Sequence, residues 1–105
     1  MSTPFAAIAD PTRRHLVERL TVDGPTTATA LAAELDVSRQ AVAKHLGILT
    51  DAGLARSQRV GRETRFHPEP MGLAAIRTWV DDVESAWANR LDRLSGAVER
   101  RGSVG

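Results

Sequence analysis

The stretch from Val37 to Gly53, VSRQAVAKHLGILTDAG, constrains the fold more than any other part of the chain. Ser38 can cap a helix, because its hydroxyl accepts hydrogen bonds from the free backbone N–H groups of the turn that follows. Gly53 can end the helix in a left-handed conformation. Between them, apolar residues recur at helical spacing and form one stripe, at Val42, Leu46 and Leu49. The stretch therefore predicts an amphipathic helix with one face in a core.

The opposite face of this helix suits contact with DNA bases. Arg and Lys match guanine acceptors, Gln can bond adenine through two hydrogen bonds, and small residues let the backbone approach closely. The same pattern also fits a solvated surface helix, so the rest of the chain decides between the two. The face carries two cations, one amide and two small residues, which are Arg39, Lys44, Gln40, Ala43 and Gly47.

Length and composition indicate one globular domain. The chain has 105 residues, of which 42% are hydrophobic and 26% charged. It has no cysteine, which excludes disulfides and thiolate-bound zinc. No apolar run approaches the ~18 residues that a membrane span needs, and the first residues lack the pattern of a signal peptide. We therefore expect a cytoplasmic protein without a membrane partner.

The net charge of +1 hides an uneven distribution along the chain. Residues 38–68 contain six Lys and Arg against two Asp and Glu, whereas residues 1–37 and 69–99 are acidic. The basic middle segment indicates a polyanionic partner, although such blocks also arise by chance in a short chain.

A helix is expected on the N-terminal side, after a short helical turn at residues 5–9. Asp10 is a good cap and Pro11 fits the first helical position, where its missing N–H costs nothing. This helix should run to about Val22, before Gly24.

A shorter helix should then lead into the Ser38 helix. Thr26 or Thr27 can cap it. Only Asp36 and Val37 connect it to Ser38, so the two helices should cross steeply, as in a helix-turn-helix motif. Its apolar stripe consists of Ala28, Leu31, Ala32 and Leu35.

After Gly53 the apolar period becomes alternating, which predicts a two-stranded hairpin over residues 54–60 and 64–67. Guanidinium groups bind phosphates through paired hydrogen bonds and enter minor grooves, so an arginine-rich hairpin beside the Ser38 helix is typical of a DNA-binding wing. The alternative is an edge hairpin whose charges prevent aggregation. The hairpin carries Arg56, Arg59, Arg62 and Arg65.

A last helix from Pro70 to about Arg100 would span roughly 45 Å, longer than a domain of this size is wide. We expect its far half to pair with the same helix of a second subunit, with Trp79 and Trp87 as anchors. The domain then covers residues 1–100, and residues 101–105 should be disordered. The apolar stripe has approximately heptad spacing, at Leu73, Ile76, Val80, Val83, Trp87, Leu94 and Ala97, widened by Leu91 and Val98. Of these, Leu73 and Ile76 are expected to close the monomer core.

Together these segments resemble the ArsR family of winged helix-turn-helix transcriptional repressors. The resemblance rests on IADPTRRHLVERL at residues 8–20, TATALAAELDVSRQAVAKHLGILTDAGL at 27–54 and RSQRVGRETRFH at 56–67. It implies a mainly helical fold with a small β-hairpin. It also implies a homodimer joined through the N-terminal segment and the last helix, and release from DNA by an inducer.

The expected site residues form two sets. Gln40 and Lys44 are expected to read bases, and Ser38 and Arg39 to hold phosphates. The full DNA-contacting set is Ser38, Arg39, Gln40, Ala43, Lys44, His45, Arg56, Arg59, Arg62 and Arg65. The dimer-contacting set is Phe5, Ile8, Trp79, Val80, Val83, Trp87, Leu91 and Leu94.

No metal site is predicted. Metal-sensing members of the family carry Cys motifs or His, Asp and Glu clusters in the last helix, but here Cys is absent and the last helix has no His. The three histidines are dispersed along the chain. We expect His15 to pack against the core and His67 to be exposed, while His45 either reaches a phosphate or supports helix packing.

The sequence thus predicts a homodimeric repressor that binds a palindromic operator without a cofactor and responds to an unknown small-molecule inducer. An activator would use the same DNA-binding surface. One alternative is a winged-helix module that binds an acidic protein without sequence-specific DNA binding. Another is a small enzyme, for which no nucleophile or phosphate-loop motif stands out.

Overall fold

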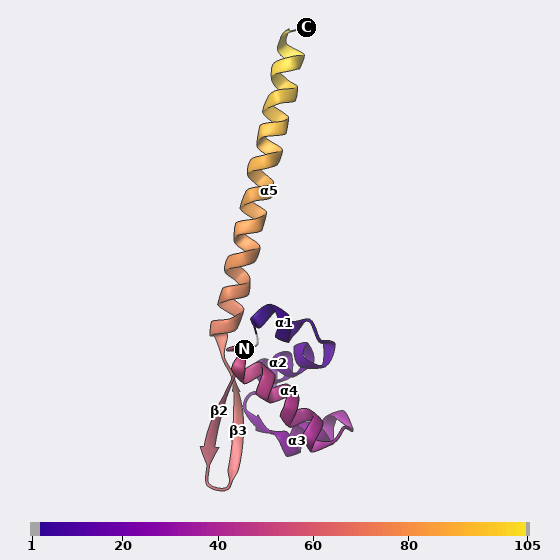
Figure 1. The fold of residues 1–105 in the computed structure, drawn as a ribbon, viewed down its shortest axis with the longest axis vertical. Helices are drawn as coiled ribbons and strands as arrows, with labels where there is room; N and C mark the ends of the chain where they lie inside the picture. The colour runs from indigo at the N-terminus through magenta and orange to yellow at the C-terminus, as the bar shows by residue number, and fades with distance from the viewer. Residues whose placement is uncertain (1–2, 105) are drawn as a thin grey trace.

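The computed structural model describes the backbone of residues 3–104 and the side chains of residues 3–96. This part of the chain forms a small helical domain with a three-stranded sheet, from which one long helix projects (Figure 1). The principal extents are 76 × 26 × 24 Å. None of its helices combines the length and the apolar character of a membrane span.

Two helices begin the chain, and both start where a side chain caps them. Helix α1 covers Pro4–Ile8, and the hydroxyl of Thr3 accepts a hydrogen bond from the backbone of its first turn. Helix α2 covers Pro11–Asp23, and Asp10 accepts from the N–H of Arg13 at 3.0 Å. This bond to the charged carboxylate holds the pKa of Asp10 below its ordinary value. The predicted cap and first position are confirmed.

Helices α3, Ala28–Leu35, and α4, Arg39–Asp51, form the predicted helix-turn-helix. Asp36 adopts a left-handed conformation with φ 54°, and the N–H of Val37 donates to the carbonyl of Ala32 at 3.3 Å. This geometry satisfies the carbonyls that the end of a helix leaves open, and it turns the chain within two residues.

The sheet contains one strand that the sequence analysis missed. Strands β2, Ala55–Val60, and β3, Glu63–Pro68, form the expected hairpin, and Gly61 in its turn has φ 63°. Strand β1, Thr26–Thr27, pairs antiparallel with β3, giving the order β1-β3-β2. A two-residue strand is too short to show the alternating pattern from which strands are predicted. It ties the start of α3 to the hairpin.

The core lies where α2, α3 and α4 meet the base of the hairpin. Leu54 and Ala55, at the start of β2, are buried there, and Phe66 of β3 packs against the cluster. The apolar stripes predicted on α3 and α4 are confirmed, although Leu35 of α3 is only half-buried. The buried residues of the three helices are Leu16, Val17, Leu20, Ala28, Leu31, Ala32, Val42, Leu46 and Leu49.

Helix α5 covers Pro70–Val104, and most of its length projects from the domain (Figure 1). Ile76 packs against the core as expected, but Leu73 is 40% exposed, so the prediction that it closes the core was wrong. The helical backbone continues four residues past the expected end at Arg100, whereas residues 101–105 were expected to be disordered. Gly105 lies outside the described residues, and the domain boundary at residue 100 stays a prediction.

Candidate nucleic-acid interface

The first turns of α4 present the face that the sequence assigned to DNA. The hydroxyl of Ser38 accepts from the N–H of Ala41 at 3.1 Å, so this residue caps the helix. The stripe on the other side of α4 is completely buried, which fixes the helix in the domain. The residues predicted for the DNA-facing side are all exposed to solvent, and they are Arg39, Gln40, Ala43, Lys44 and Gly47.

The hairpin β2–β3, which we call the wing, divides its arginines between two faces. Arg59 lies opposite Thr64, on the face that continues to the buried Ala55, and Arg56 points to the other face. Arg56 approaches Glu69 with an Nε–Oε2 distance of 3.9 Å.

Arg65 lies on the same face as Arg56, which we call the outer face of the wing. It approaches Glu63, with an Nη2–Oε2 distance of 3.9 Å. Arg62 occupies the turn. Among the described side chains, neither Arg62 nor Arg39 has an acidic partner within ion-pair distance. The four arginines therefore do not form one uniform surface, and Arg59 and Arg62 are the two that face α4.

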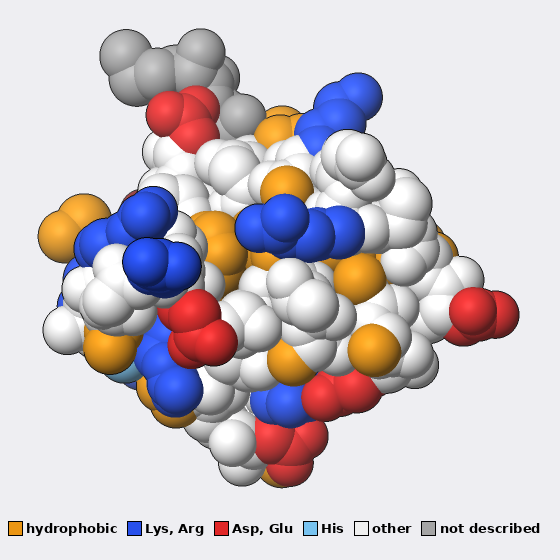
Figure 2. Space-filling model, turned by 90° about the horizontal axis from the view of Figure 1, so that it is seen from below, with side chains coloured by type: hydrophobic (Ala, Val, Ile, Leu, Met, Phe, Trp, Pro, Cys, Tyr) orange, Lys and Arg blue, Asp and Glu red, His pale blue; other side chains and the backbone are white. Residues whose placement is uncertain are grey.

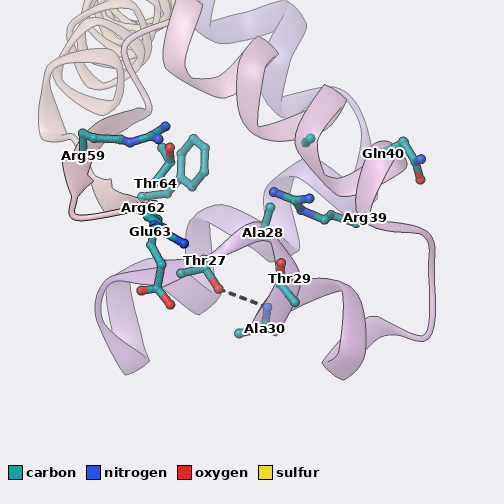
Figure 3. Close-up of a pocket in the computed structure, with 12 residues that line it drawn as sticks. Thr27, Ala28, Thr29, Ala30, Arg39, Gln40, Arg59, Arg62, Glu63 and Thr64 are labelled. Atoms are coloured by element: carbon teal, nitrogen blue, oxygen red, sulfur yellow. Dashed lines mark hydrogen bonds between the residues drawn. The ribbon is translucent and has the colours of Figure 1, made fainter.

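A groove separates the wing from the start of α4 (Figure 3). Its volume is about 710 Å³. Arg39 extends from α4 toward the wing, whereas Gln40 borders the groove and its amide group points away from the wing (Figure 3). The lining residues come from β1, α3, α4 and the wing, and they are Thr27, Ala28, Thr29, Ala30, Arg39, Gln40, Ala43, Arg59, Arg62, Glu63, Thr64 and Phe66.

Basic side chains dominate the wing side of this surface. Figure 2 views the molecule from the end opposite α5 and shows a group of Lys and Arg side chains on the left, over the wing, with others near the centre, at the upper right and toward the bottom. Guanidinium groups on both walls of a groove can hold the phosphates of one strand while the exposed face of α4 meets base edges.

The side of this groove formed by β1 and α3 was not predicted from the sequence. The hydroxyl of Thr27 caps α3 by accepting from the N–H of Ala30 at 3.2 Å, and Thr29 lines the groove two residues further along (Figure 3). Phe66 lines it from β3. The only sequence signal for β1 was the pair of β-branched residues Thr26 and Thr27, and such a pair also fits a loop.

Two of the histidines differ from the prediction. His15 is exposed instead of packed against the core. His67 is half-buried instead of exposed, and its Nε2 lies 2.8 Å from Oε1 of Gln58 on the neighbouring strand. His45 is half-buried, with Nδ1 3.4 Å from Nη1 of Arg13 in α2. It therefore lies against the domain and not on the exposed face of α4.

In the described residues, no three His, Asp or Glu side chains are placed to share a metal ion.

The residues predicted to contact a second subunit lie along α5 and on α1. Trp79 and Trp87 are 54% and 61% exposed. The ring of Phe5 meets that of Trp79 edge to face, with centroids 5.5 Å apart. Ile8 packs against the core of its own chain. Leu91 and Leu94 are exposed, Val80 is 36% exposed and Val83 is half-buried. The side chains of residues 97 and 98, also in the predicted stripe, lie outside the described set.

Known proteins share this architecture and much of the sequence. Residues 8–58 match the family model of a helix-turn-helix domain. The HTH-type transcriptional regulator Rv2034 of Mycobacterium tuberculosis is 38% identical over 98 residues, which cover 93% of this chain and 88% of that protein. The transcriptional repressor SdpR of Bacillus subtilis is 36% identical over 62 residues, which cover 59% of this chain and 68% of that protein.

A solved structure agrees with these relationships. The ArsR-like transcriptional regulator from Rhodococcus sp. RHA1 has a TM-score of 0.75 to this fold at 37% identity, over 86% of this chain and 84% of that one. With its winged helix-turn-helix architecture, the chain belongs to the ArsR family of transcriptional regulators and is a DNA-binding regulator of transcription.

Proposed function

We propose that the protein is a repressor that binds an inverted-repeat operator as a homodimer. In this arrangement the α4 helices of two subunits enter successive major grooves about one DNA turn, ~34 Å, apart. The protein recognises the operator through base contacts from α4 and phosphate contacts from α4 and the wing.

The observation that carries this proposal is the groove between α4 and the wing. Arg39 and Arg62 line it from opposite sides without acidic partners among the described side chains, and Arg59 joins them from β2. Guanidinium groups without acidic partners on a concave surface favour a polyanion, because phosphates satisfy several of their donors at once. Arg59 makes one bond within the wing, from its Nε to the carbonyl of Gly61 at 3.2 Å.

Individual roles follow from where each side chain lies. Gln40 and Lys44 are exposed on α4 and would read base edges, while Arg39 would hold a phosphate at the groove. Arg59 and Arg62 would contact the backbone or the minor groove from the wing. Arg56, Arg65 and His45 have partners within the chain, at 3.9, 3.9 and 3.4 Å, and would contribute less to the DNA contact.

The apolar face of α5 supports dimerisation. A monomer rarely exposes so many large apolar side chains on one helix, since water contact disfavours them. Trp79, Trp87, Leu91 and Leu94 are each more than half exposed, and Phe5 extends the patch onto α1. A second copy of the same surface would cover this face with matching chemistry.

Repression and induction complete the proposal. The related protein SdpR is named as a transcriptional repressor, which supports the same direction of control here. Release by a small-molecule inducer rests on the family resemblance alone.

Sedimentation with and without operator DNA tests the proposal. We expect wild-type dimers and two chains on each operator duplex. Val83→Glu places a carboxylate in the apolar stripe, where burial without a partner is costly, and should give monomers with weak operator affinity. Ser85→Glu adds the same charge on the opposite side of α5 and should stay dimeric. A monomeric wild type, or one chain bound to each operator, would overturn the paired-groove arrangement.

A further inference from the structure

Arg13 of α2 contacts two other helices through one guanidinium group. Its Nε donates to the carbonyl of Ala7 at 2.7 Å, and its Nη2 donates to the carbonyl of Ala6 at 3.3 Å, both at the end of α1. Its Nη1 lies 3.4 Å from Nδ1 of His45 on α4. A cation at the C-terminal end of a helix is favourable, and the rigid fork of arginine can serve three acceptors together.

The start of α2 holds Arg13 in place for this role. Its N–H donates to the carboxylate of Asp10, so its backbone is part of the helix cap. The side chain is half-buried between the helices it joins. The cap thus holds the backbone of Arg13, and the carbonyls of α1 hold its side chain.

The chemistry of the contact determines the state of His45. Arginine only donates hydrogen bonds, so Nδ1 of His45 must accept. A hydrogen bond in this direction corresponds to the tautomer with the ring proton on Nε2. A side chain engaged in this way on the flank of α4 orients the helix, since a rotation of α4 would break the contact.

The two ends of this connection lie at the two proposed interfaces. On one side, α1 carries Phe5, whose ring packs against Trp79 of α5 on the dimer face. On the other side, His45 directly follows Lys44, which is exposed on the DNA face of α4. Arg13 therefore stands between the surface that joins the subunits and the surface that meets DNA.

We infer that Arg13 is a positioning residue, which acts through His45 to hold the recognition helix at a fixed orientation relative to α1 and the dimer face. This role for Arg13 rests on the proposed function. In a dimer, such orientation sets the spacing and the relative rotation of the two α4 helices, on which operator affinity depends. His45 supports the helix from within the protein and does not bind a phosphate.

A double-mutant cycle on operator affinity tests the inference. Arg13→Ala and His45→Ala should each weaken binding of the operator by about fivefold or more, while the double variant should be within about twofold of Arg13→Ala. Losses that multiply would show that His45 contacts DNA independently and would overturn the inference, as would an unchanged affinity for His45→Ala.

Arg14→Ala is the matched control. Arg14 is in the same turn of α2 and donates to the carbonyl of Ile8 at 3.3 Å, so it also holds the end of α1. It has no hydrogen bond to α4 within the described part of the chain. We expect operator affinity within about twofold of wild type. A loss equal to that of Arg13→Ala would assign the effect to α1 alone and contradict the role of His45.

Two further measurements separate positioning from folding. Arg13→Lys keeps a cation at the end of α1 but cannot serve three acceptors in the same geometry, so it should keep the thermal midpoint and dimer affinity and still lose operator affinity by about fivefold. In DNA-free protein, nitrogen NMR should show the Nε2–H tautomer of His45 in the wild type and a mixture in Arg13→Ala. A mixture in the wild type would overturn the inference. Failure of the wild type to bind any operator would instead overturn the proposed function.

Discussion

The N–H of Gly72 donates to the carbonyl oxygen of Gly53 across 2.8 Å, which joins the first turn of α5 to the end of α4. A Cβ on Gly72 would lie 2.8 Å from that oxygen and 2.9 Å from the side chain of Leu54. The long helix therefore leaves the domain at a point where two backbones touch, and only glycine allows this approach.

Gly72→Ala should destabilise the protein by about 1–3 kcal/mol, because a methyl group must displace a backbone carbonyl and a buried leucine. Thermal unfolding measures this change. Gly47→Ala is the control, because the new Cβ would meet nothing within 4 Å and Gly47 lies within α4. It should raise stability by roughly 0.5–1 kcal/mol through helix propensity. A Gly72→Ala variant as stable as wild type would show that α5 can shift without loss.

The sequence predicted the helix-turn-helix well because its signals are local. Asp10, Thr27 and Ser38 each precede an apolar stripe of helical period, and each is the cap that the structure shows. The pairing of Thr26 with Phe66 was not predictable, because it joins residues far apart in the sequence and spans only two residues of strand.

The candidate site was predicted only in part, because side-chain direction depends on tertiary context. The alternating strand pattern placed Arg56 and Arg59 on opposite faces, but not the groove that Arg59 shares with Arg39. The position of His45 depended on Arg13, which belongs to another helix. Neither relationship has a signature within one segment.

Acid should weaken the link between α2 and α3. Arg19 donates to both carboxylate oxygens of Glu34, at 2.9 and 2.8 Å, and this bonding lowers the pKa of Glu34 from its ordinary value. A carboxyl whose pKa is lower in the folded state stabilises the fold above its unfolded pKa and loses that effect as the pH falls through the folded value. Glu34→Gln should therefore lower the thermal midpoint at pH 7, and the difference from wild type should narrow below about pH 4.5.

Glu18→Gln serves as the control for this measurement. Glu18 is exposed on α2 and makes no ion pair with any described side chain, so its substitution should leave the midpoint unchanged across the same range. An equal difference between Glu34→Gln and wild type at pH 7 and at pH 3 would show that the bond to Arg19 contributes nothing through charge.

Arg62→Ala should weaken binding to all DNA sequences alike, because a phosphate contact carries no base information. The slope of log affinity against log salt should fall by up to ~1 unit. Arg56→Ala should change the slope less, since Glu69 already lies 3.9 Å from its guanidinium group. Salt titrations of the two variants and wild type check this, and an unchanged slope for Arg62→Ala would place the turn of the wing away from DNA.

Gln40→Ala should change which operator is preferred. Its side chain extends from the first turn of α4, away from the groove, where an amide can bond a base edge. We expect a loss of ~1–3 kcal/mol on the best site and a relaxed preference at one position of each half-site. Gln58→Ala removes an amide that bonds His67 on the outer face of the wing and should leave the preference unchanged. If Gln40→Ala binds every sequence as well as wild type, Gln40 does not read a base.

Selection of bound duplexes from a random DNA pool at ~150 mM salt tests whether two α4 helices read one operator together, because weak phosphate-only binding is suppressed under these conditions. The dimeric winged helix predicts enrichment of an inverted repeat whose half-sites lie about one DNA turn apart, ~34 Å from centre to centre. A pool without enrichment, or one enriched in a single unrepeated half-site, would contradict the proposal that the two α4 helices of a dimer bind two half-sites of one operator.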